Sequence, residues 1–197
     1  MKLLSAQNIT YSINENKLFH NLSFDINSGE GLHVKGGNGS GKSTLLRIIM
    51  GITSPSKGLI ETYDRDFNIS YLGHKNAIKN YLTPLENLEL VFNYAELKIA
   101  LKWLGKLGLL DVQDELTASL SFGQQKKLAL IRVLAKSSEL MVLDEPFVGL
   151  DKTTADQLSS FLIQKLSEGV GLILTSHIDP MINCKELNLG EQDAEIS

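Results

Sequence analysis

The chain has 197 residues, of which 43% are hydrophobic and 21% are charged, and its formal net charge is −4 at pH 7. This composition is typical of a folded globular domain and excludes a disordered or fibrous chain. The acidic balance also argues against a nucleic-acid-binding protein, because binding to a phosphate backbone needs a basic face.

The sequence has no apolar run that approaches the roughly 18 to 20 residues needed to span a bilayer. Its first eight residues turn polar too early for a signal peptide. We therefore expect a cytoplasmic protein, in which a role in transport would require a membrane partner supplied by another chain. The single cysteine, Cys184, excludes an internal disulfide and favours a buried structural thiol.

The first third of the chain is predicted to contain strands and one helix. Alternating or continuous apolar residues predict short strands at Leu3–Tyr11, Asn21–Ile26, Gly31–Val34, Leu59–Thr62 and Asn68–Leu72. A glycine-rich loop follows the third of these strands, and the segment after the loop, Ser43–Gly51, has helical apolar spacing.

The middle of the chain is predicted to be helical. Thr83-Pro84-Leu85-Glu86 combines a helix N-cap, a proline at the first helical position and a capping-box glutamate. Helical spacing continues from there through Tyr94, and again from Ala95 to about Leu104. The basic pair Lys126-Lys127 is expected on the solvated surface of a further helix, because charge runs usually are.

Near the C-terminus, the pattern returns to strand, helix and strand. Continuous apolar runs at Leu140–Leu143 and Gly171–Leu174 suit parallel strands buried on both faces. The helix Lys152–Ser167 lies between them, with Asp151 as its N-cap. We predict a single α/β domain with a mostly parallel sheet and an N-terminal antiparallel β part. A helical subdomain at residues 74–136 is inserted into an α/β core at residues 1–73 and 137–197.

The glycine-rich loop matches the phosphate-binding pattern G-x-x-x-x-G-K-[ST] between a strand and a helix. Its backbone N–H groups can converge on phosphates, Lys42 supplies a positive charge, and the Ser43 hydroxyl can ligate Mg²⁺. The alternative, a glycine turn with an incidental lysine, does not need this strand–loop–helix context. The predicted nucleotide-binding residues of the loop are Gly36, Gly37, Asn38, Gly39, Ser40, Gly41, Lys42, Ser43 and Thr44.

Two carboxylates follow the buried strand Leu140–Leu143, at the edge where α/β sheets bind ligands. Asp144 is the candidate magnesium ligand. Glu145 can polarise the water that attacks the terminal phosphate of ATP. An Asp-Glu pair alone is more often a loop start, but the phosphate loop in the same chain favours ATP hydrolysis.

Ser121 and Gln124 form a possible capping box at the start of a helix with strong apolar spacing. One interpretation is a well-capped helix and nothing more. The other is an anion site, because a serine hydroxyl and the amide of Gly123 at a helix N-terminus can bind a phosphate.

Leu120–Gln125 resembles the signature of ABC ATPases, a family of P-loop proteins. This resemblance implies that Ser121, Gly123 and Gln124 dock on the ATP held by a second, head-to-tail copy. Gly149–Asp151 resembles the loop that lines the dimer seam in the family, which makes Asp151 a further nucleotide-site candidate. The resemblance therefore implies a homodimer that shares two ATP molecules.

Three further candidates rest on the same resemblance. His177 resembles the switch histidine that contacts the terminal phosphate, although a histidine at a strand end is more often structural. Tyr11 is the candidate for stacking on adenine, with a core role as an even alternative. His74 occupies the position where most ABC ATPases carry glutamine, and its ring could meet nucleotide, water or metal, with a structural role as the alternative.

The segments Tyr71–Lys79, Leu82–Leu88 and Ser119–Lys127 are similar to ATP-binding subunits of cytochrome c maturation haem exporters. This similarity implies an integral membrane permease subunit and haem-handling membrane proteins as partners. It also implies a peripheral location on the cytoplasmic face of the inner membrane. The alternative functions are a soluble ABC ATPase in cofactor assembly and a P-loop kinase, although a kinase would need neither the signature helix nor the Asp-Glu pair.

Overall fold

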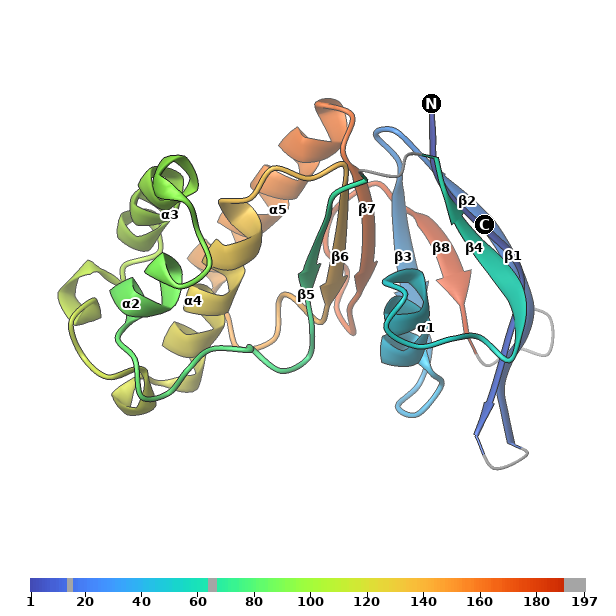
Figure 1. Cartoon of the computed structure of the whole chain (residues 1–197), viewed down its shortest axis with the longest axis horizontal. Coiled ribbons are helices and arrows are strands. Elements are labelled where there is room, and N and C mark those ends of the chain that lie inside the picture. The colour runs from blue at the N-terminus through green and yellow to red at the C-terminus, as the bar shows by residue number, and fades with distance from the viewer. Residues whose placement is uncertain (14–15, 64–66, 190–197) are drawn as a thin grey trace.

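The computed structural model describes residues 1–13, 16–63 and 67–189. The expected core segment that ends at residue 197 therefore extends beyond the described part of the chain. The described residues form an α/β fold with two sheets, as predicted (Figure 1).

The smaller sheet is antiparallel and has the strand order β2-β1-β4. Its strands are β1 (Lys2–Ile13), β2 (Asn16–Asn27) and β4 (Lys57–Thr62). Leu4, Ile9, Leu22 and Ile26 point from β1 and β2 into the core and are almost fully buried. This sheet is the antiparallel part predicted at the N-terminus.

The larger sheet has the strand order β5-β6-β7-β3-β8, and every neighbouring pair is parallel. Its strands are β3 (Gly31–Lys35), β5 (Ile69–Leu72), β6 (Leu140–Asp144), β7 (Gly171–Thr175) and β8 (Lys185–Asn188). The phosphate loop follows β3, and the carboxylate pair begins at the end of β6. Only β7 separates these two strands, so both segments leave the same edge of the sheet.

The side chains of β6 alternate between two hydrophobic clusters, one on each face of the parallel sheet. Met141 and Leu143 pack with the helices α4 (Phe122–Leu134) and α5 (Lys152–Ser167). Leu140 and Val142 pack with α1 (Lys42–Ile49) and the antiparallel sheet. The fold therefore has three layers, with the parallel sheet in the middle (Figure 1).

The helical part of the chain packs on the first of these clusters. It contains α2 (Pro84–Glu89), α3 (Tyr94–Lys106) and two short 3₁₀ turns at Leu110–Val112 and Thr117–Ser119, followed by α4. Leu88 of α2 and Leu104 of α3 belong to the same continuous cluster as the strand residues Leu143 and Leu174. The helices therefore share their core with the sheet.

The predicted helix that continued from Thr83 through Tyr94 is wrong, because α2 ends at Glu89 and a new helix begins at Tyr94. Asn93 caps that new helix: its Oδ1 accepts hydrogen bonds from the amides of Ala95 at 2.9 Å and Glu96 at 3.0 Å. A capping asparagine must have non-helical backbone angles, so it interrupts an otherwise continuous apolar pattern. The capping box of Thr83 and Glu86 at the start of α2 is confirmed.

The strand β8 was not predicted. It has only four residues, and Lys185 and Glu186 give it no apolar run. It is held by parallel pairing to β3 and by the ion pair of Lys35 with Glu186, both of which depend on tertiary structure. Cys184, just before β8, is half-buried, and burial raises the pKa of its thiol to about 11.

The expected solvated position of the basic pair is wrong for Lys126, whereas Lys127 is partly exposed. Lys126 is only 3% exposed, and the ammonium of Lys127 lies 2.7 Å from a carboxylate oxygen of Asp151. Both residues lie on α4, whose long buried face leaves little of its surface to solvent.

Among the residues that the structure describes, no helix is both long enough and apolar enough to cross a membrane.

Candidate nucleotide-binding site

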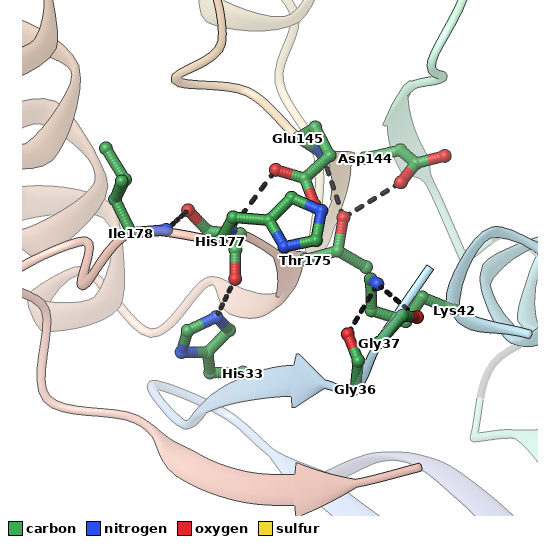
Figure 2. A network of polar contacts seen from close by, with 10 residues as sticks. His33, Gly36, Gly37, Lys42, Asp144, Glu145, Thr175, His177 and Ile178 are labelled. Carbon is green, nitrogen blue, oxygen red and sulfur yellow. Dashed lines mark hydrogen bonds and ion pairs between the residues drawn. The ribbon is translucent and has the colours of Figure 1, made fainter. Parts of the chain in front are cut away.

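The phosphate loop runs from the end of β3 to the first residue of α1. Gly41 has φ +97°, and a Cβ at this position would lie 3.0 Å from the Phe19 ring, so both the backbone angle and the space require glycine. The ammonium of Lys42 turns back over the loop and donates to the carbonyls of Gly36 at 2.8 Å and Gly37 at 3.1 Å (Figure 2). The carbonyls of the loop thus hold the Lys42 ammonium at the entrance of the site.

Asp144 and Glu145 are both buried at the end of β6, and Thr175 of the neighbouring strand β7 joins them. The Thr175 hydroxyl donates to Asp144 Oδ1 at 2.8 Å and accepts from the Glu145 amide at 2.9 Å (Figure 2). Glu145 has φ +49°, a strained backbone angle for a residue with a side chain. The bond from the Glu145 amide to Thr175 stabilises this backbone conformation, and the bond from Thr175 to Asp144 fixes where the Asp144 carboxylate points.

Each carboxylate keeps one buried oxygen without a hydrogen-bond donor among the described residues, namely Asp144 Oδ2 and Glu145 Oε1. A buried oxygen in this state is costly unless a cation, a water molecule or a ligand satisfies it. The site is therefore prepared for a bound group that is positively charged or can donate hydrogen bonds.

His177 lies directly beside Glu145 (Figure 2). Its amide donates to Glu145 Oε2 at 3.3 Å, and its ring Nε2 is 3.4 Å from Oε1, a contact that becomes an ion pair when the ring is protonated. The side chain of His177 is 54% exposed, whereas that of Glu145 is 11% exposed. The histidine therefore sits at the solvent edge of the buried carboxylate.

His33 was not predicted as a site residue. It is buried in β3, and its Nε2 donates to the carbonyl of Ser176 at 3.1 Å, which ties the residue before His177 to the sheet (Figure 2). Burial lowers the pKa of the His33 ring, so the neutral form is favoured in the folded chain. A histidine inside a strand carries no sequence signal for this role, since it depends on the neighbouring strand.

A cavity of about 380 Å³ collects most of the predicted residues. It is lined by the phosphate loop and the start of α1, by the carboxylate pair with the two histidines that face it, and by two aliphatic side chains of the antiparallel sheet. The lining residues are Asn38, Gly39, Ser40, Gly41, Lys42, Ser43, Thr44, His74, Asp144, Glu145, His177, Ile13 and Leu18. The exposed His74 thus lies within the site, although it is far from the phosphate loop in sequence.

Tyr11 is not among the residues that line this cavity. Its ring stacks on Phe19 with a centroid distance of 6.2 Å, and it packs against the hydrophobic cluster of the antiparallel sheet. Tyr11 is half-buried in this position, which favours its alternative, a packing role in the sheet. Ile13 and Leu18, which were not predicted, line the cavity.

Ser121, Gly123, Gln124 and Asp151 also lie outside the cavity. The predicted capping box is confirmed: the Ser121 hydroxyl accepts from the Gln124 amide at 3.2 Å, and Gln124 Oε1 accepts from the Ser121 amide at 2.8 Å. Ser121 is exposed, and the side chain of Phe122 beside it is 62% exposed. The signature segment therefore faces outward and does not reach the phosphate loop of its own chain.

Asp151 is the N-cap of α5, as predicted, and its Oδ1 accepts from the Thr154 amide at 2.8 Å. Its other oxygen pairs with Lys127, and these bonds hold the pKa of the carboxyl well below its usual range. The helix that carries the signature is thereby linked to the loop before α5.

The buried Lys126 lies in the electrostatic field of the carboxylate pair. Burial lowers the pKa of its ammonium, while the charges of Asp144 and Glu145 raise it. Burial is the largest of these effects, so the pKa of Lys126 is lowered overall.

The described residues contain no cluster of three or more histidine, cysteine, aspartate or glutamate side chains that could hold a metal on their own. The unsatisfied Asp144 Oδ2 and the hydroxyl of Ser43 nevertheless line the same cavity. Mg²⁺ typically binds one or two protein oxygens together with substrate phosphates. These two residues therefore fit a magnesium ion that arrives with a nucleotide.

A family profile described as ABC transporter matches residues 19–148, which include the phosphate loop, the signature and the carboxylate pair. The chain belongs to the ABC transporter family. As a member of this family it is an ATP-binding protein and an ATPase.

Two curated relatives share the name cytochrome c biogenesis ATP-binding export protein. The chain is 37% identical to the protein of Idiomarina loihiensis, covering 89% of this chain and 85% of the relative, and 36% identical to that of Dechloromonas aromatica, covering 95% and 100%. Among solved structures, a dimeric bacterial ABC transporter cassette is similar with a TM-score of 0.82 and 25% identity, over 98% of this chain and 97% of that one.

Proposed function

We propose that this chain is the ATP-binding and ATP-hydrolysing subunit of an ABC exporter for cytochrome c biogenesis, and that it closes as a head-to-tail homodimer around two ATP molecules. One observation carries the proposal: the phosphate loop and the carboxylate pair line one cavity, while the signature residues lie outside it and Ser121 is exposed. The names of the curated relatives support the process in which the subunit acts.

The phosphate loop binds the phosphates of ATP. In the structure the Lys42 ammonium donates to the carbonyls of Gly36 and Gly37. When ATP binds, this ammonium donates to the β- and γ-phosphates instead, because phosphate oxygens carry more charge than a peptide carbonyl. The backbone N–H groups of residues 36–44 and the N-terminus of α1 add further donors and a partial positive charge.

Ser43 and Asp144 would hold a Mg²⁺ ion that arrives with the nucleotide, and the ring of His74 lines the same cavity as a further candidate ligand or a partner for water. Bound there, Mg²⁺ would supply charge neutralisation for the β- and γ-phosphates. Thr175 already donates to Asp144 Oδ1, so Oδ2 is the oxygen of this carboxylate that would remain for the ion or for its water.

Glu145 acts as the general base that orients the attacking water, and its unsatisfied Oε1 accepts that water's proton. His177 lies beside this oxygen and contacts the γ-phosphate.

The dimer follows from the position of the signature segment. Ser121 is exposed and Gly123 and Gln124 are partly exposed at a helix N-terminus, where N–H groups favour an anion. A second copy placed head to tail brings this segment onto the ATP held by the first copy, with Asp151 at the seam. The dimeric cassette to which this chain is similar supports such an assembly.

The membrane partners are an integral permease subunit and haem-handling proteins, and hydrolysis drives haem export or release of a haem-loaded chaperone. The chain then lies on the cytoplasmic face of the inner membrane and is held there by its partners. The division into an α/β core (1–73 and 137–197) and a helical subdomain (74–136) is part of this proposal. A soluble ATPase in cofactor assembly is not favoured by the names of the relatives.

The decisive experiment deletes the gene of this chain in its host and measures haem-containing cytochromes c by haem staining. We expect these cytochromes to be lost, to return with the wild-type chain and not to return with Glu145→Gln at equal abundance. Affinity purification of the wild-type chain from membranes is expected to recover a multi-span subunit. Normal cytochrome c levels in the deletion strain, or recovery of a complex without any membrane protein, would contradict the proposal.

A further inference from the structure

The segment of residues 176–181 follows β7 and carries His177, yet it belongs to no helix or strand. Strand pairing ends at Thr175, so it does not hold this segment in place. The amides of His177 and Ile178 instead donate to side-chain oxygens, at 3.3 Å and 3.2 Å. The position of His177 beside Glu145 therefore depends on contacts with side chains.

His33 supplies one of these contacts from β3. Leu32 and Val34, its neighbours in the strand, belong to the hydrophobic cluster that contains α1, so His33 points to the opposite face of the sheet. There its Nε2 reaches past the end of β7 and donates to the carbonyl of Ser176 at 3.1 Å (Figure 2). His33 is 4% exposed and Ser176 is 7% exposed, so the bond is shielded from water.

The burial of His33 has to be compensated by this bond. β3 lies inside the parallel sheet, between β7 and β8, where strands are usually apolar on both faces. A buried imidazole without a hydrogen-bond partner is costly, whereas a leucine would fill a similar volume without that cost. The hydrogen bond to Ser176 therefore accounts for a histidine at this position.

The hydrogen bonds of His33 and Glu145 meet at one peptide group. The carbonyl oxygen of Ser176 and the N–H of His177 belong to the same planar unit. The oxygen accepts from His33 at 3.1 Å, and the N–H donates to Glu145 Oε2 at 3.3 Å. Hydrogen bonds linked in this way strengthen one another, and a rotation of the peptide group would break both. The orientation of this group, and with it the contact of His177 with Glu145, therefore depends on His33.

We propose that His33 is a positioning residue for ATP hydrolysis, which holds the peptide group between Ser176 and His177 so that His177 stays beside Glu145. His33 itself does not line the cavity beside the phosphate loop. It acts from β3, the strand that runs into the phosphate loop, and it ties that strand to the segment that contacts Glu145. This inference rests on the proposed function, because it takes Glu145 to be the general base.

The first test measures kcat and KM for ATP in the wild-type chain, in His33→Leu and in His33→Gln. Leucine fills the space of the ring but cannot donate to Ser176, so kcat should fall by about three- to tenfold, the usual effect of one lost hydrogen bond. KM should stay within about twofold of the wild-type value, because His33 does not line the cavity. The side-chain amide of glutamine can donate in place of Nε2, so His33→Gln should keep at least about half of the wild-type kcat.

The second test follows amide hydrogen exchange in the same full-length chains without nucleotide. In His33→Leu the amide of His177 should exchange about three- to tenfold faster, because its peptide group has lost one of two hydrogen bonds. Ile9→Val is the matched control, since it trims the buried core of the antiparallel sheet and lowers thermal stability without touching residues 176–181. Both kcat and the exchange of the His177 amide should be unchanged in this control.

A wild-type kcat in His33→Leu would overturn the inference, and so would wild-type exchange of the His177 amide in that variant. Equal losses of kcat in His33→Leu and His33→Gln would assign the effect to the shape of the ring and would also overturn it. In each of these results the wild-type chain still hydrolyses ATP and still supports cytochrome c formation. Failure of the proposed function would instead appear as normal cytochrome c levels in the deletion strain.

Discussion

Thr175 and Asp144 are joined by a hydrogen bond of 2.8 Å between neighbouring strands, and the same threonine hydroxyl accepts from the amide of Glu145. A single oxygen therefore holds both the carboxylate of Asp144 and the backbone of Glu145. This arrangement exists only because β6 and β7 pair in the register that places Asp144 opposite Thr175.

Thr175→Val is expected to lower kcat strongly while ATP binding is retained. Valine has the shape of threonine but leaves the Glu145 amide and Asp144 Oδ1 without their buried partner, at a cost of about 1–3 kcal/mol in the free energy of unfolding. Thr175→Ser, which keeps the hydroxyl, is the matched control. ATPase assays and denaturant unfolding of both variants measure the effect, and equal activity of the two would contradict the positioning role.

Glu145→Gln is expected to bind ATP normally and to slow turnover by about 10²- to 10⁴-fold, the usual contribution of a general base. Glutamine keeps the size of the side chain but cannot accept the proton of the attacking water. Size-exclusion chromatography with ATP should show a dimer with trapped nucleotide. A hydrolysis rate like that of the wild type would show that another group is the base.

Ser121→Arg is expected to leave ATP binding by the monomer intact and to abolish turnover, because the serine acts on the ATP of the second copy. Ser121→Thr keeps the helix cap and should stay active. Mixing Ser121→Arg chains with Lys42→Ala chains gives hybrid dimers in which one ATP site has both a normal loop and a normal signature. The mixture should hydrolyse ATP faster than either variant alone, and a mixture as inactive as both would contradict sharing across the dimer.

His33 is expected to make the protein less stable as the pH falls below neutrality. Burial lowers its pKa in the folded chain from the ordinary value of 6.5, so below that value the unfolded chain binds more protons. The stabilisation is complete above pH 6.5 and is lost as the pH falls toward the folded pKa. His33→Gln keeps a donor for the Ser176 carbonyl without titrating. Thermal melts from about pH 5 to 7.5 should show a shallower decline for this variant than for the wild type.

The sequence predicted the parts of the site that are contiguous in the chain. The phosphate loop carries its own chemistry in eight consecutive residues, and Asp144 with Glu145 follows a strand that is buried on both faces. The capping box of Ser121 and Gln124 is likewise encoded within four residues. Local patterns of this kind can be recognised from the sequence because the residues that interact lie close together in the chain.

The features that were missed depend on contacts between distant segments. Lys126 has the sequence environment of a surface lysine, and only the position of α4 against the sheet buries it. His33 gains its role from Ser176, which is 143 residues away in the chain. Tyr11 and Ile13 are both hydrophobic residues of one strand, and the register shifts between Ile9 and Ser12 prevent simple alternation from showing which of them faces the cavity.

The loop before α5 and the start of α4 are in van der Waals contact. A Cβ on Gly123 would lie 2.9 Å from the carbonyl oxygen of Gly149, and one on Gly149 would collide with the ring of Phe122. The Lys127–Asp151 ion pair closes the same contact one helical turn further on. In a head-to-tail dimer, the ATP bound to one copy would contact the start of α4 in the second copy. Any shift of that helix start would move the Gly149–Asp151 loop of the second copy, which follows that copy's Glu145. Hydrolysis at either site would therefore depend on whether the other site is occupied.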